Sequence, residues 1–364
     1  MLVLRVGVFL AGSGLVMATL YSAMRTFVLP RAAPDLFVRA IFVSLRLVLS
    51  LRLRSAHTYE ARDRVMALYA PIGLMLLLPG WLALVCVGYT AMFWAVGVEP
   101  LYAAFKLSGS SLLTLGFASA DGTLQLLLAF SAAVIGLILV ALLIGYLPTI
   151  YAAFARREAQ VTLLEVRAGQ PPSAVEMLLR FHRIHGLDQL DEVWHTWEAW
   201  FADIEESHTS LPALVFLRSP NAHHSWVTAS GAVLDGAALL QSAVDWPVSA
   251  LPALCARAGY LALRHIADFF DVVYNPDPHY PDPISITRAE FDAACETLAA
   301  AGVPLKEDRE LAWKDFAGWR VNYDTVLLAL ASITMAPVAP WSSDRSLVTR
   351  VPSLALWRKG DKTA

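Results

Sequence analysis

Apolar residues follow two different patterns along this chain. Residues 6–24, 65–98 and 124–154 form nearly continuous apolar runs, each close to or above the roughly 20 residues that a helix needs to cross a bilayer. From about Gln160 onward, apolar residues recur at helical spacing between polar ones. The pattern predicts an all-α membrane protein, with transmembrane helices in the first 157 residues and an α-helical soluble domain after them.

The first apolar run predicts an N-terminal transmembrane helix within residues 1–28. A cleaved signal peptide is the alternative, because Arg5 precedes the run. However, Arg25 and Arg31 follow it, in place of a small-x-small cleavage site and a polar mature start. We therefore expect the helix to be retained.

Residues 34–54 are apolar but are interrupted by arginines. Arg39 and Arg46 are seven residues apart and share one face of a helix. Such a pattern is typical of a helix that lies in the membrane interface. We expect this helix and a cytoplasmic link within residues 29–64, the alternative being a second spanning helix with snorkelling arginines.

The second half of the chain predicts a helical domain over residues 158–340. Thr287 and Glu290 have the spacing of a capping box, and Gly302 is placed to end that helix. No long alternating strand pattern is present in this sequence, so we expect almost no sheet.

Two smaller expectations concern the edges of helices in this domain. Gly186 breaks a helical pattern, and Asp188 is a candidate cap for the helix that follows. The stretch 341–364 is polar and predicts a poorly ordered tail.

The two parts of the chain carry opposite charge. Residues 1–157 contain 12 Lys and Arg against 5 Asp and Glu, and residues 158–364 contain 16 against 26, giving net charges of +7 and −10. An acidic soluble half argues against nucleic acid as a partner. The arginines of residues 25–64 and 156–157 place both regions in the cytoplasm. The sequence therefore predicts a multi-pass protein of the cell (inner) membrane, with the N-terminus outside and the C-terminal domain inside.

The cysteines support a reducing compartment for the soluble half. Cys86, Cys255 and Cys295 are the three cysteines, and their spacing suggests neither a disulfide framework nor a metal site. We expect no metal and no cofactor.

The link between the last two apolar runs contains the most specific motif. A short amphipathic stretch, Leu101–Leu113, leads into Thr114, Leu115, Gly116, Phe117 and Ala118. This arrangement resembles the pore loop of the potassium-channel superfamily of the two-transmembrane-helix type, whose filter reads Thr-Val-Gly-Tyr-Gly or Thr-Val-Gly-Phe-Gly. The resemblance covers residues 65–157 and implies outer helix, pore helix, filter and inner helix. It also implies a homotetramer in the lipid bilayer that passes a monovalent cation, most simply K⁺.

Backbone carbonyl oxygens would coordinate the ion in such a filter. Four copies of a short extended segment can surround a dehydrated cation with oxygens that replace its water. In this chain the ligands would come from residues 114–118, with Gly116 supplying dihedrals that a side chain resists. Ala118 stands at the family's last filter glycine and would cost about 1 kcal/mol or more if a positive φ is needed there. We therefore expect weaker potassium selectivity.

Three residues of the last apolar run are candidates for gating. Gly136 lies where family members often place a hinge, and Gly145 with Pro148 could bend the cytoplasmic end of the helix. For Gly136, a plain helix-packing contact is the equal alternative.

The soluble half offers candidate groups but no recognised site, and its ligand stays open. His182 and His185 lack a third metal ligand in the sequence. We expect core packing for Trp194, Trp197, Trp200 and Phe201. We expect a solvated face for Glu198, Asp203, Glu205 and Glu206, the alternative being an acidic ring below a pore. We expect an inter-helix network, the alternative being a ligand contact, for Trp319, Arg320, Asn322, Tyr323 and Asp324.

The sequence bears on three classes of function. A cation channel fits the pore-loop resemblance. A non-conducting membrane sensor or scaffold that reuses this fold is the alternative. A membrane-anchored enzyme has no catalytic motif to support it, so we expect no enzymatic activity.

Overall fold

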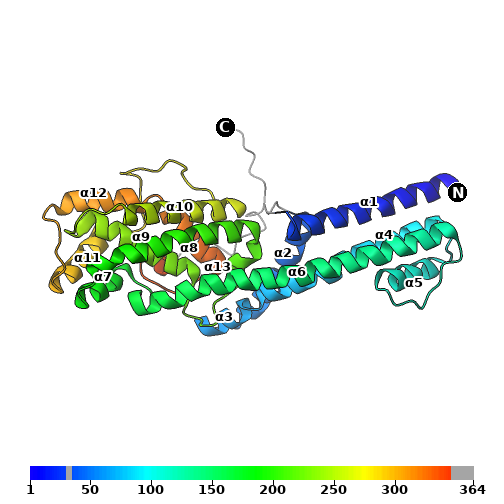
Figure 1. Ribbon diagram of the computed structural model, residues 1–364, viewed down its shortest axis with the longest axis horizontal. Helices are drawn as coiled ribbons and strands as arrows, with labels where there is room; N and C mark the ends of the chain where they lie inside the picture. The colour runs from blue at the N-terminus through cyan, green and yellow to red at the C-terminus, as the bar shows by residue number, and fades with distance from the viewer. Residues whose placement is uncertain (30–34, 346–364) are drawn as a thin grey trace. The chain divides into compact units, whose positions relative to one another are not determined.

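The computed structural model describes residues 1–29 and 35–345, and these residues form two compact units (Figure 1). The first, which we call the membrane unit, comprises Met1–Arg52 and Leu68–Ala152. The second, the helical domain, comprises Leu53–Ala67 and Ala153–Ala364. The described residues contain α-helices, short 3-10 turns and one isolated bridge between Val244 and Leu305, so the predicted all-α class is confirmed for them.

The membrane unit holds the long apolar helices. Three helical stretches of the described residues are long and apolar enough to cross a membrane, namely Leu2–Phe27, Tyr59–Ala95 and Thr123–Ala168. They make the chain a candidate multi-pass membrane protein. The elements of this unit are α1 (Leu2–Phe27), α2 (Leu36–Leu53), α4 (Tyr69–Ala95), α5 (Leu101–Leu112) and the first part of α6 (Thr123–Ala168).

The arginine-interrupted segment forms α2, which is not among the candidate spans of the described residues. It packs on α4, where the Tyr69 hydroxyl donates to the Phe42 carbonyl at 3.3 Å. Gly73 lets the Phe42 ring approach, since a Cβ there would lie 2.4 Å from it. Its interfacial position stays a prediction.

Close approach of backbones holds α1 against α4. A Cβ on Gly12 would lie 2.5 Å from the Gly88 carbonyl oxygen, so only glycine fits at this contact. Small residues at such contacts let apolar helices pack without a hydrophobic driving force between them.

The helical domain is built around one almost completely buried helix, α9. All of its residues except Gln241 are buried, and α7, α10, α12 and α13 pack on it. The remaining elements surround this core. The helices are α3 (Tyr59–Met66), α7 (Ala174–Arg183), α8 (Leu190–Ser210), α9 (Trp226–Ala243), α10 (Leu251–Phe269), α11 (Arg288–Ala300), α12 (Arg309–Arg320) and α13 (Asp324–Thr334), with 3-10 turns η1 (Leu187–Gln189), η2 (Pro212–Phe216) and η3 (Ser343–Arg345).

Several local predictions in this domain are confirmed. Thr287 and Glu290 form the capping box of α11, and Gly302 follows that helix with φ of 86°. The aromatic set of α8, Trp194, Trp197, Trp200 and Phe201, is buried in the core as expected.

Other edges differ from the sequence prediction. The last apolar run was expected to end near residue 154, but α6 continues to Ala168 because Arg156 and Arg157 are good helix formers and nothing breaks the helix before Gly169. Asp188 caps no helix; it lies within η1, and α8 begins two residues later.

The expected tail also begins in an ordered way. Ser342 is buried, and Arg345 donates to Glu290 at 2.8 Å. Residues 346–364 of that expected tail lie outside the described residues.

Candidate functional site

Helix α5 is fixed to its neighbours by buried serines. The Ser108 hydroxyl donates to the Cys86 carbonyl of α4 at 2.9 Å, and both Ser108 and Ser110 are buried. One turn further along α4, the Tyr89 hydroxyl and the Ser131 hydroxyl of α6 lie 2.8 Å apart. The short helix therefore has a defined position within the membrane unit.

The chain after α5 is not helical until α6 begins at Thr123. Ser110 accepts two hydrogen bonds from this irregular segment, one at its carbonyl and one at its hydroxyl. The Leu115 N–H donates to the Ser110 carbonyl at 2.8 Å, and the Ala118 N–H donates to the Ser110 hydroxyl at 3.1 Å. The predicted filter residues thus form a short, anchored, irregular segment.

Backbone strain in this segment lies at an unexpected residue. Gly116 has φ of 74°, as expected, but Thr114 has φ of 53°. A β-branched residue rarely adopts this left-handed conformation, and such strain tends to concentrate at functional sites. Ala118 is not among the described residues with positive φ, so the backbone cost foreseen for it does not arise. The strained residue, Thr114, lies four residues before Ala118, where the sequence predicts the backbone cost.

The side chains of the segment face away from the chain's own core. Leu115 and Phe117 are 59% and 58% exposed, and Thr114 is also exposed. The Thr114 hydroxyl donates to the Leu113 carbonyl at 2.8 Å. The Lys106 ammonium lies 5.8 Å from the centre of the Phe117 ring. Apart from the cation–π contact, little of this apolar surface is covered by the described residues of this chain.

The gating candidates on α6 fall into different environments. A Cβ on Gly136 would lie 2.0 Å from the Leu112 carbonyl oxygen at the end of α5. Gly136 is therefore a close packing contact between α6 and α5. Gly145 has no described heavy atom within 4 Å of where its Cβ would be. Pro148 lies inside an uninterrupted helix, and the Thr149 hydroxyl donates to the Gly145 carbonyl at 3.2 Å. Hinge roles for these residues stay predictions.

The polar network expected near the end of α12 is confirmed for Arg320, Tyr323 and Asp324. Arg320 donates to Asp235 at 2.6 Å and to Asp324 at 2.7 Å, and the Tyr323 hydroxyl donates to Asp235 at 2.8 Å. Burial alone would lower the pKa of Arg320, but the charges of Asp235 and Asp324 raise it, so the guanidinium stays charged. The sequence could not identify Asp235 of α9 as the central acceptor.

A second buried arginine was missed by the sequence reasoning. Arg157 was assigned a topological role, yet it is buried and donates to the carbonyls of Leu214 and Leu217 at 2.7 and 2.6 Å. It also pairs with Glu158 at 2.8 Å. Burial and the neighbouring charge of Arg157 hold the pKa of His208 well below its usual value, so that ring is neutral.

The histidines form no metal site. No group of three or more His, Cys, Asp or Glu residues within the described parts of the chain could hold a metal ion. His224 instead lies 2.8 Å from Glu165.

Comparison with known proteins identifies no relative. No family model, no curated protein and no solved structure matches this chain.

Proposed function

We propose that this protein is a channel for monovalent cations, formed by four copies of the chain in the cell membrane. One observation carries the proposal. A short buried-face helix, α5, and a strained irregular segment, 113–118, lie between the second and third candidate membrane spans. Irregular backbone of this kind is unfavourable in contact with lipid, so its presence between two spans favours a pore.

The physical reason lies in hydrogen bonding. Backbone that is neither helix nor closed sheet is accepted at membrane depth only where protein buries it or where it lines a water-filled cavity. Leu115 and Phe117 are more than half exposed in the single chain, so one copy does not bury the segment. Four copies around an axis would cover it and would bring four sets of carbonyls together.

The proposed ion path consists of the carbonyls of residues 114–118. Such a ring replaces the hydration shell of a dehydrated K⁺ ion. Phe117 has no phenol group with which to brace the segment, and its ring lies beside Lys106. We therefore propose a cation pore with weaker potassium preference than the superfamily shows, and a cytoplasmic helical domain that assembles or gates it.

Single-channel recording tests conduction directly. Purified protein in planar bilayers, under opposed potassium and sodium gradients, should give reversal potentials between those of the two ions. Gly116→Val should abolish the current, because a branched side chain at φ of 74° would strain the backbone of the segment. Gly109→Ala is the matched control, since its Cβ would meet no described atom within 4 Å. Absence of current from the wild type at every voltage and lipid composition would favour the non-conducting scaffold.

Mass and topology measurements test the assembly. Native mass spectrometry should give a tetramer, and a stable monomer or dimer would contradict the pore. In a background without native cysteines, Ser119→Cys and Val273→Cys should react with membrane-impermeant reagents from opposite sides of the membrane. Labelling from the same side would contradict the proposed topology.

A further inference from the structure

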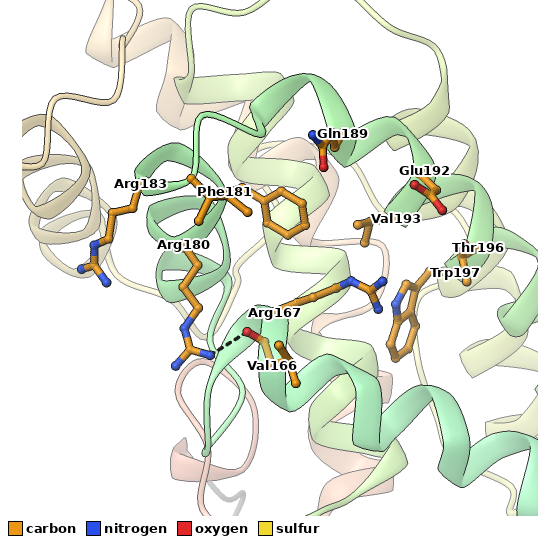
Figure 2. Close-up of a pocket in the computed structure, with 11 residues that line it drawn as sticks. Val166, Arg167, Arg180, Phe181, Arg183, Gln189, Glu192, Val193, Thr196 and Trp197 are labelled. Atoms are coloured by element: carbon orange, nitrogen blue, oxygen red, sulfur yellow. Dashed lines mark hydrogen bonds between the residues drawn. The ribbon is translucent and has the colours of Figure 1, made fainter.

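The helical domain contains a pocket of about 430 Å³. Its walls come from three consecutive elements: the last turn of α6, helix α7, and the segment from η1 into α8 (Figure 2). Pockets that bind small organic molecules commonly measure about 300–1,000 Å³. The pocket lies wholly within the helical domain and shares no residue with the pore segment.

The lining combines flat apolar surface with positive charge. Phe181, Val193 and Trp197 are core residues that also line the pocket. Among the charged lining residues are Arg167, Arg180 and Arg183 against the single carboxylate of Glu192. This excess of positive charge stands out because residues 158–364 carry a net charge of −10.

The guanidinium of Arg180 is engaged by protein groups. It donates to the carbonyls of Glu165 and Val166 at 2.9 and 2.8 Å and to the Glu176 carboxylate at 2.7 Å. Both carbonyls lie in the last turn of α6, where helical hydrogen bonding ends; the Glu165 carbonyl also accepts from the Gly169 N–H at 2.9 Å. Arg180 therefore closes the end of α6 and is not available to a ligand.

Arg167 and Arg183 have their charges available. Arg183 reaches Glu176 only at 3.7 Å and is otherwise exposed. Arg167 is half-buried and has no hydrogen-bond or ion-pair partner among the described residues. Figure 2 shows its side chain extending across the pocket toward Trp197. A half-buried guanidinium without a partner is costly, and an anion in the pocket would supply that partner.

We propose that this pocket binds a small organic anion, with one carboxylate or phosphate group held by Arg167 and with a flat apolar body lying against Phe181 and Trp197. The planar fork of Arg167 suits the two oxygens of either group. Arg183 adds charge at the rim, and Gln189 and Thr196 offer further hydrogen bonds. A cation is disfavoured because Glu192 is the one carboxylate in the lining.

The pocket lies at the end of α6, so a bound ligand could regulate the proposed channel through this helix. Val166 and Arg167 belong to the last turn of α6, the same continuous helix that carries Gly136 against α5. A ligand held by Arg167 would act directly on this helix, whose other end packs against α5. This regulatory consequence rests on the proposed channel function, whereas binding itself does not.

Ligand-observed ¹⁹F NMR on the full-length protein in detergent tests the binding. The probes are 4-(trifluoromethyl)benzoate, 4-(trifluoromethyl)phenyl phosphate and the neutral 4-(trifluoromethyl)benzamide, with empty micelles as the blank. We expect at least one anion to bind about tenfold or more tightly than the amide, as a charge-assisted hydrogen bond provides. The anion that binds better identifies the preferred group. Equal binding of anions and amide, or no binding, would overturn the proposal.

Variants assign the binding to the pocket. Arg167→Gln should weaken the anion about tenfold or more and leave the amide unchanged, while Arg167→Lys should retain part of the affinity. Arg257→Gln, an exposed arginine of α10 away from the lining, is the matched control. Wild-type affinity in Arg167→Gln would overturn the assignment.

Recording in bilayers separates the two proposals. Anion binding without any current would support the anion site and contradict the channel proposal. Current without binding would leave the channel standing and remove the anion site. With both present, addition of the tighter anion should change the open probability of the wild type but not of Arg167→Gln; no change would remove the regulatory role.

Discussion

Helices α6 and α9 are both strongly apolar, yet their surroundings differ completely. Every residue of α9 except Gln241 is buried by other helices of its domain. In the most apolar 18-residue window of α6, only 22% of the residues are buried within the chain. Hydrophobic composition alone therefore does not distinguish a core helix from a membrane helix. Length does: α6 has 46 residues and α9 has 18.

The two units also differ in what holds their helices together. The membrane unit brings backbones into contact at glycines, as between Gly12 and Gly88 and between Gly136 and Leu112. The helical domain uses buried arginines, Arg157 and Arg320, that bind carbonyls and carboxylates from several elements. We expect the first unit to be sensitive to added volume and the second to lost charge.

Removal of Arg320 should give the largest effect. Its side chain is completely buried and pairs with Asp235 and Asp324. Because Arg320→Met leaves two carboxylates buried without their cation, we expect a loss of about 3–5 kcal/mol in the free energy of unfolding of the helical domain. Denaturant unfolding of the full-length protein in detergent, followed by circular dichroism, measures this loss.

The matching control is Arg257→Gln, an exposed arginine, which should change stability by less than about 0.5 kcal/mol. Asp235→Asn combined with Arg320→Met should recover part of the loss, since it removes one of the stranded charges. Equal losses for Arg320→Met and the control would show that the domain does not depend on this pair.

The sequence predicted what depends on local chemistry. The apolar runs, the capping box at Thr287 and the short helix before Thr114 follow from residue type and spacing, and the structure agrees. It also predicted that Arg320, Tyr323 and Asp324 form a network, because polar residues between apolar helical faces need partners.

The rest depends on contacts between distant parts of the chain. Nothing in the sequence links Arg320 with Asp235, 85 residues away, or Arg157 with the carbonyl of Leu217. The positive φ of Thr114 accompanies a return of the chain to Ser110, which accepts hydrogen bonds from the N–H groups of Leu115 and Ala118. The pocket beside Arg167 likewise requires three helices to be placed first.

Added volume should have the second largest effect, and only in the membrane unit. In Gly136→Ala the new methyl would lie 2.0 Å from the Leu112 carbonyl oxygen, which belongs to a fixed backbone. We expect a loss of about 1–3 kcal/mol from overpacking, seen as a lower unfolding temperature in detergent.

Gly236 of α9 provides a matched comparison in the helical domain. Its methyl would lie 2.2 Å from the Met177 terminal carbon, a flexible group that can move away. Gly236→Ala should therefore cost less than about 1 kcal/mol, and Gly145→Ala, which meets nothing, should stabilise by about 0.5–1 kcal/mol. If Gly136→Ala behaves like Gly145→Ala, Gly136 is not a packing contact.

Loss of Arg218 should have an effect of similar size, but confined to one part of the helical domain. Arg218 pairs with Asp63, donates to the Tyr59 hydroxyl at 2.6 Å, and binds the Thr334 carbonyl at the end of α13 at 2.6 Å. Because it joins α3 to the domain, Arg218→Gln should cost about 1.5–3 kcal/mol. Helix α3 should open more often.

Limited trypsin digestion measures that opening. Cleavage after Arg62 and Arg64 in α3 should be roughly tenfold or more faster in Arg218→Gln than in the wild type. Cleavage after the exposed Arg257 should be unchanged and serves as the internal control. Unaltered cleavage in α3 would mean that other contacts hold this helix.

The smallest expected effect concerns the ion pair between Glu290 and Arg345. Hydrogen bonds from Arg345 lower the pKa of Glu290 to about 2, from an ordinary value of 4.5. A lowered pKa in the folded state stabilises the protein above the unfolded value, and this contribution is lost as the pH falls from about 4.5 to about 2. The Glu290 side chain is 38% exposed, so water and salt screen the pair and less than about 1 kcal/mol is expected.

Glu290→Gln isolates that contribution, because glutamine at the same position can still complete the capping box with Thr287. The stability difference between wild type and variant should be constant above about pH 5 and should shrink as the pH falls toward about 2, where Glu290 of the folded protein is half protonated. Denaturant unfolding at a series of pH values, with both proteins in the same buffers, gives the difference and removes the titration of every other carboxylate. A difference that stays constant down to pH 2 would mean that the charge of Glu290 contributes nothing. High salt should reduce the difference at neutral pH, whereas it should leave the effect of losing the buried Arg320 nearly unchanged.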